Sequence, residues 1–155
     1  MSLVNSSKII HVLGVANYMY KKAKALGWNQ SRCNEMWALG LIHDCEHLIN
    51  QLDPSIKLEN GGQVLNEASF KYSFEIANVW RKVDNDKVTD ELILLDEADN
   101  NVDNNGEVIS FTLRMEQHRN KHGADSAMYK RSSEYAKWYL SNYGDDYLNK
   151  KYLNK

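Results

Sequence analysis

Two aspartates stand where the surrounding pattern predicts buried side chains. Apolar residues precede each of them at helical spacing: Cys33, Trp37, Gly40 and Leu41 before Asp44, and Val88, Leu92 and Leu95 before Asp99. Both carboxylates are expected to point inward near the C-terminal ends of their helices, where the helix dipole disfavours negative charge. A buried carboxylate must be protonated, paired or bound to a metal ion. Pairing with arginine or capping of a loop would satisfy either aspartate singly.

Two histidines offer these acids a different partner. His43 directly precedes Asp44, and His11 lies on a separate amphipathic segment. A single helical histidine is more often a surface or satisfied core residue, and spacing alone does not bring four residues together. Imidazole nitrogens combined with carboxylate oxygens nevertheless suit a divalent ion such as Mn, Fe, Co, Ni or Zn, with Mg as a further candidate. His11, His43, Asp44 and Asp99 are therefore candidate ligands of a divalent metal ion.

The segments around these residues resemble the HD-domain metal-dependent phosphohydrolases, which are named for an adjacent His-Asp pair. The similar segments are 11–16 (HVLGVA), 26–27 (LG), 38–44 (ALGLIHD) and 94–99 (LLDEAD). Residues 102–106 (VDNNG) and 114–115 (RM) are similar to the tail of small bacterial members, and His122-Gly123 stands where those members have an aromatic residue followed by glycine. The resemblance spans residues 8–140. It implies a single all-α domain of the HD type with six to seven helices, and the same four ligands in the family's order.

One feature of that family is missing from this chain. Many members carry a second histidine pair between the doublet and the last aspartate, which supports a second metal ion. Residues 48–117 contain no histidine, and residues 78–82 read NVWRK where relatives often have His-Gly. The resemblance therefore implies a mononuclear centre, and it leaves open a site that has lost activity.

The resemblance implies that such a centre hydrolyses a small phosphorylated substrate, for example a nucleotide. A divalent ion acts as a Lewis acid on a phosphoryl oxygen and lowers the pKa of bound water from about 15.7 toward 7. A positive group should also neutralise the phosphate charge, and Lys8 is the first candidate because it lies one helical turn before His11. Arg81 and Lys82 are candidates for substrate binding if a loop carries them over the site. Solvated surface charge is the alternative for both.

Residues just after the doublet are candidates for proton transfer. Glu46 and His47 follow His43 closely enough to act as general acid or base, or to orient a ligand. The resemblance places a proton-transfer residue near here in some members, usually a glutamate. Arg114 is expected to have a structural role, in an ion pair or at the preceding turn. Other polar residues are expected to be exposed and to have no ligand role: Asp96, Glu97, His118 and His122.

Two other functions compete with a phosphohydrolase. One is a binding or regulatory module that keeps the HD fold and the metal ion but has no turnover. The other is a zinc peptidase, because His43 and His47 share a helical face at i and i+4. That chemistry requires a glutamate directly after the first histidine, where this chain has Asp44, and no third ligand is marked.

Composition limits the kind of protein. The 155 residues, 43% hydrophobic and 26% charged, suit one globular domain. A net charge of -2 argues against a broad basic surface and hence against a nucleic-acid duplex as partner. The sequence has no membrane-length apolar run and no signal-peptide pattern, and its two cysteines form no disulfide framework. We expect a cytoplasmic protein without membrane contact, and a homodimer is compatible with these features.

Periodicity and capping residues predict helices throughout. Ile9, Leu13, Ala16 and Tyr20 recur at helical spacing and predict an apolar face on the first helix. Residues 36–42 are apolar on nearly every side, which predicts a central second helix. The expected helices are residues 6–26, 29–47, 63–69, 72–82, 86–99, 110–121 and 126–143, with a loop at 51–62 and a small hairpin around 103–106.

Overall fold

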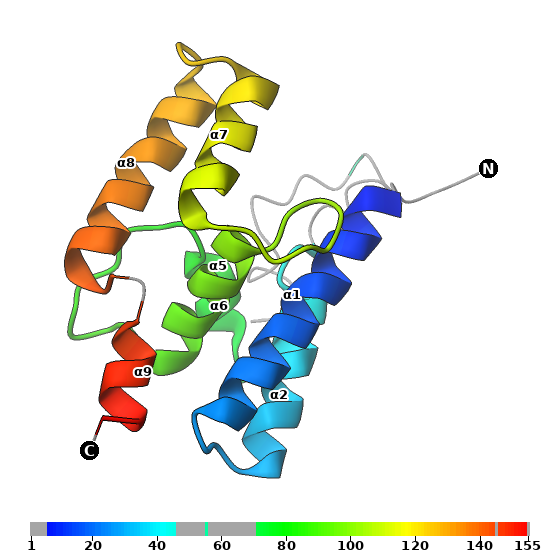
Figure 1. The fold of residues 1–155 in the computed structure, drawn as a ribbon, viewed down its shortest axis with the longest axis vertical. Helices are drawn as coiled ribbons and strands as arrows, with labels where there is room; N and C mark the ends of the chain where they lie inside the picture. Colours follow the sequence, from blue (N-terminus) through cyan, green and yellow to red (C-terminus); the bar gives the residue numbers. More distant parts are fainter. Residues whose placement is uncertain (1–5, 46–54, 56–70, 145, 155) are drawn as a thin grey trace.

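The computed structural model describes residues 6–45, 55, 71–144 and 146–154, and within these ranges the chain is all-α, as expected (Figure 1). Its helices are α1 (Ser6–Ala25), α2 (Gln30–Ile42), α5 (Ser73–Asn78), α6 (Asp90–Asn101), α7 (Phe111–His122), α8 (Ala127–Asn142) and α9 (Tyr147–Tyr152). Among the described residues, no helix has the length and apolar character needed to cross a membrane.

Side-chain caps determine where four of these helices begin. The side-chain oxygen of the N-cap residue accepts a backbone N–H three residues further on at Asn29, Thr89, Ser110 and Ser126. Three of these caps lie within one residue of the expected helix starts. Helix α6, by contrast, begins at Asp90, after the Thr89 cap, four residues later than expected.

Helix α6 is the central helix. All of its residues from Leu92 to Asn100 are buried, and α1, α2, α5, α7 and α9 pack around it. The second helix, expected to be central, buries only Cys33, Met36, Leu39 and Gly40 and leaves Trp37 39% exposed. The prediction for α2 was therefore wrong, because its apolar residues face α1 on one side while Trp37 faces outward.

Helices α1 and α2 lie side by side with their backbones in contact (Figure 1). A Cβ atom added to Gly40 would lie 2.6 Å from the Cα atom of Ala16, so only glycine permits this approach. The face of α1 that packs inward carries His11 and Val15 rather than Ile9 and Leu13, which are 45% and 43% exposed. The expected apolar face of α1 was therefore misplaced at its N-terminal end.

The turn after α6 docks on α1 through a second close contact. A Cβ atom on Gly14 would lie 2.7 Å from Cγ1 of Val102 and 2.9 Å from the Cα atom of Gly106. The expected hairpin is reduced to a single antiparallel bridge between Val102 and Val108. The Asp103 carboxylate holds the turn by accepting two backbone N–H groups, at 2.8 and 2.9 Å.

Other expected elements differ in extent or cannot be compared. The helix expected at 72–82 is reduced to α5, and α9 was not expected. The predicted loop at 51–62 and helix at 63–69 lie almost wholly outside the described residues. The same holds for the predicted end of the second helix beyond residue 45.

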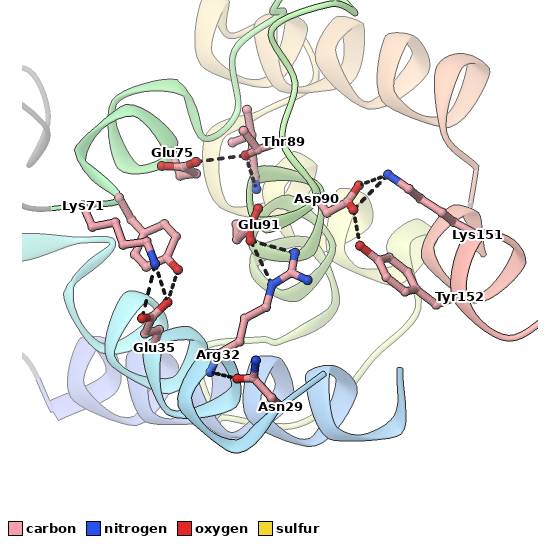
Figure 2. A network of polar contacts seen from close by, with 12 residues as sticks. Asn29, Arg32, Glu35, Lys71, Glu75, Thr89, Asp90, Glu91, Lys151 and Tyr152 are labelled. Carbon is pink, nitrogen blue, oxygen red and sulfur yellow. Dashed lines mark hydrogen bonds and ion pairs between the residues drawn. The ribbon is translucent and has the colours of Figure 1, made fainter. Parts of the chain in front are cut away.

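A polar network ties the outer helices to the start of α6 (Figure 2). Arg32 of α2 donates from Nε and Nη2 to Glu91 at 3.0 and 2.7 Å. Lys151 of α9 pairs with Asp90 at 2.8 Å, and Thr89 donates to Glu75 of α5 at 2.9 Å. These contacts gather α2, α5 and α9 at the N-terminal end of α6, opposite the end that carries Asp99.

Candidate metal centre

Two imidazole rings from neighbouring helices face each other next to the α1–α2 contact. His11 of α1 and His43, directly after α2, are both 1% exposed, and their ring centroids lie 5.7 Å apart. Gly40, one turn before His43, is the residue that lets the two helix backbones touch. The local sequence therefore brings two buried histidines together through a glycine contact.

Backbone carbonyl oxygens set the orientation of both rings. Nδ1 of His43 lies 2.6 Å from the carbonyl oxygen of Gly40, and Nδ1 of His11 lies 3.2 Å from that of Asp103. A carbonyl oxygen can only accept, so each Nδ1 carries the hydrogen and donates it. Each Nε2 is then a lone-pair donor in the neutral ring, the arrangement common among metal-binding histidines.

Both Nε2 atoms point at one carboxylate of the central helix. Oδ1 of Asp99 lies 2.8 Å from Nε2 of His11 and 3.4 Å from Nε2 of His43. One ligand atom from each of these three residues lies within 4.8 Å of the others. Nε2 of His43 is buried without a hydrogen-bond partner among the described residues. Two nitrogens and a carboxylate oxygen converging in this way suit a divalent cation.

Asp44, the fourth predicted ligand, stands at the edge of this group. Its Oδ2 lies 3.4 Å from Nε2 of His43 and 3.0 Å from Nζ of Lys8. Lys8 was expected near the site and is there, but it contacts a predicted ligand. The cluster of convergent ligand atoms therefore contains His11, His43 and Asp99, while Asp44 forms an ion pair beside it.

The charges of these buried groups shift the pKa values of their neighbours. Burial by itself lowers the pKa of His43, but the charges of Asp44 and Asp99 raise it to about 9. Burial would raise the pKa of Asp99, yet the hydrogen bond with His11 and the nearby charge of His43 hold it well below its usual range. In the protein alone, a proton on the imidazole balances the acids, and a divalent ion would take over this role.

Trp80 covers the outer side of Asp99. Its indole Nε1 donates to Oδ2 of Asp99, and its backbone N–H donates to Oδ1 of Asp96 at 3.0 Å. Trp80 has a φ of 61°, a left-handed conformation that costs a residue with a bulky side chain about 1–3 kcal/mol. The carboxylates of Asp96 and Asp99 hold Trp80 in this conformation. The indole in turn fixes Oδ2 of Asp99, while Oδ1 faces the two histidines.

A pocket of about 660 Å³ opens on the other side of Trp80, between α8, His118 of α7 and the turn after α5. Arg81 and Lys82, the predicted substrate-binding residues, line it together with Arg131. The indole of Trp80 therefore separates Arg81 and Lys82 from Asp99, and these two residues do not lie directly over the histidines. The predicted proton-transfer residues Glu46 and His47 lie outside the described residues.

Several polar residues of α6 and α7 are less exposed than predicted. Asp96 and Glu97, predicted to be exposed, are 4% and 7% exposed, because α6 is covered on all sides. His118, also predicted to be exposed, lines the pocket with its ring centroid 5.4 Å from that of Trp80. A helical spacing of four residues between Arg114 and His118 was the available sequence signal that both face one side of α7.

Comparison with known proteins found no matching family model, no matching curated protein and no matching solved structure. The resemblance to HD-domain phosphohydrolases therefore rests on the motifs in the sequence.

Proposed function

We propose that this protein is a metal-dependent phosphohydrolase with a mononuclear centre, acting on a nucleotide or another small phosphate ester. One observation carries the proposal: the Nε2 atoms of His11 and His43 converge on a single Asp99 oxygen. Both rings are held by backbone carbonyls, so their Nε2 atoms are directed at Asp99 before any ion binds. Two buried imidazoles oriented toward a buried carboxylate are better suited to binding a cation than to packing in a core.

Each residue of the centre has a distinct role in the proposed function. His11, His43 and Asp99 would hold the ion, and Asp44, whose Oδ2 lies 3.4 Å from Nε2 of His43, would join them on leaving Lys8. A divalent ion bound there would polarise a phosphoryl oxygen and acidify a water molecule. Lys8, when released from Asp44, would supply positive charge to the phosphoryl group.

The test measures metal uptake and turnover in the same preparations. Purified protein is stripped with chelator and loaded with Mn, Co or Ni, and release of p-nitrophenol from p-nitrophenyl phosphate is followed. We expect wild type to take up one ion per chain and to hydrolyse the ester. His43→Gln should lose both properties. The matched control is His122→Gln, which alters a half-buried histidine of α7 outside the metal-ligand group.

Each outcome separates the competing functions. Equal metal uptake by wild type and His43→Gln would contradict the metal centre itself. Uptake that depends on His43 without hydrolysis of any phosphate ester would favour the binding or regulatory module. The ion pair between Lys8 and Asp44 occupies one predicted ligand, and it is the observation that favours the binding or regulatory module.

A further inference from the structure

Arg114, on the first turn of α7, is a buried charge for which the described residues provide no partner. Only 8% of the residue is exposed. Within the described part of the chain its guanidinium forms no ion pair, and its Nε is buried without a hydrogen-bond partner. The first turn of α7 also contains no acidic residue. The expected ion pair with an acidic neighbour is therefore not found among the described residues.

The position of this charge is unfavourable in two respects. Removing a guanidinium from water carries a large penalty unless an anion faces it. The N-terminal end of a helix carries partial positive charge of its own, which repels a cation and attracts an anion. An anion bound next to Arg114 would offset both the desolvation penalty and the repulsion by the helix end. Arg114 is therefore suited to binding an anionic ligand.

His118 follows Arg114 by one helical turn and faces the same side. Its Nε2 is also buried without a hydrogen-bond partner among the described residues. Burial, followed by the nearby charge of Arg114, lowers the pKa of His118 to about 4. The ring is therefore neutral at physiological pH, with one N–H to donate and no charge of its own.

The pocket beside His118 gives an anion a route to the imidazole, which lies one helical turn from Arg114; Arg114 itself is not among the described lining residues. Arg81, Lys82 and Arg131 line the pocket, and Glu134 is the only acid among its described lining residues. Three cations against one acid attract an approaching anion. Trp80 forms the wall shared with the metal centre, since its indole packs near His118 and donates to Asp99.

We propose that Arg114 and His118 form a binding site for a phosphate-type oxyanion, reached through the pocket that Arg81, Lys82 and Arg131 line. The planar guanidinium donates two parallel hydrogen bonds to two oxygens, and the imidazole N–H donates to a third. The identification of this anion as the charged group of a substrate rests on the proposed hydrolase function. Binding of the anion itself requires no metal ion.

Inorganic phosphate is the probe, and all measurements are made in chelator against chloride at equal ionic strength. Isothermal titration gives the phosphate affinity, and urea unfolding gives the stability that phosphate adds to the folded state. Arg114→Met keeps a side chain of similar length without charge. Arg119→Met removes an exposed arginine from the same helix and is the matched control.

We expect saturable phosphate binding by wild type and by Arg119→Met, and none by Arg114→Met. In chloride buffer, Arg114→Met should be at least as stable as wild type, because an unpaired buried charge is gone. His118→Gln should bind phosphate about tenfold more weakly, the effect of losing one hydrogen bond to a charged ligand. This variant carries the test if Arg114→Met does not fold.

Absence of saturable binding by wild type would overturn the proposal. So would equal phosphate affinity in Arg114→Met and Arg119→Met, or, if Arg114→Met does not fold, unchanged affinity in His118→Gln. Because chelator is present, the result is independent of the metal centre. Phosphate binding in a protein that takes up no metal would refute the hydrolase and leave this anion site standing. Metal uptake without phosphate binding would refute this anion site and leave the metal centre standing.

Discussion

Replacement of Asp96 by asparagine tests how strongly the interior around α6 opposes negative charge. Asp96 is 4% exposed and accepts the backbone N–H of Trp80 at 3.0 Å. Burial raises the pKa of its carboxyl group from 3.8 to about 7, although the hydrogen bond from Trp80 acts in the opposite direction. An asparagine at this position stays neutral at every pH, and its carbonyl oxygen can still accept the same N–H.

The sign and size of the effect follow from the difference between the two pKa values. Below pH 3.8 the carboxyl group is protonated in the folded and the unfolded state, so it adds no pH dependence. Between pH 3.8 and about 7 only the unfolded state releases the proton, and the free energy of unfolding therefore falls as pH rises. The full penalty above pH 7 is about 4 kcal/mol. Asp96→Asn removes it.

Urea unfolding in chelator at a series of pH values between 4 and 8 measures this difference. The stability of Asp96→Asn relative to wild type should be near zero at pH 4 and should grow to several kcal/mol at pH 8. Asp125→Asn, at an exposed position after α7, is the control and should follow wild type throughout. A constant difference between Asp96→Asn and wild type over this range would refute the assigned cause, which is desolvation of a buried carboxylate.

Two further predictions concern the contacts that position the metal centre. Gly40→Ala places a Cβ atom 2.6 Å from the Cα atom of Ala16, and the forced separation of α1 and α2 should lower the free energy of unfolding by about 1–3 kcal/mol in urea titrations. Unchanged stability would show that the helices separate freely. Trp80→Phe removes the indole N–H that Asp99 accepts, and competition with a chromophoric chelator should show metal affinity reduced about 10- to 100-fold. An unchanged affinity would mean that Asp99 needs no such support.

Helical periodicity is why much of the site could be predicted. Leu92, Leu95 and Asp99 share one face of a helix, so the burial of the first two predicts the inward direction of the third, as the structure has it. His11 and His43 could be named from their types and their order along the chain. That they meet Asp99 depends on the packing of three helices, which a spacing pattern does not contain.

The residues that escaped prediction are those whose environment depends on distant parts of the chain. Asp96 lies on a helix that neighbours cover on every side, and a polar residue in such a helix has the same local pattern as one facing water. Trp80 reaches Asp99 through a left-handed turn that no glycine marks. Ile9 and Leu13 are exposed because the contact at Gly40 turns His11, rather than these two residues, toward α6.

In the proposed function, the charges at the centre would make metal binding a competition with groups of the protein itself. Lys8 pairs with Asp44 at 3.0 Å, and a proton on His43 balances Asp99 when no metal ion is bound. A divalent ion must displace that proton, and it must displace Lys8 if Asp44 is to become a ligand. The displaced ammonium group would remain next to the ion, where a phosphoryl group would need it. Under the proposed function, the same lysine would neutralise Asp44 in the metal-free state and the substrate phosphate in the metal-bound state.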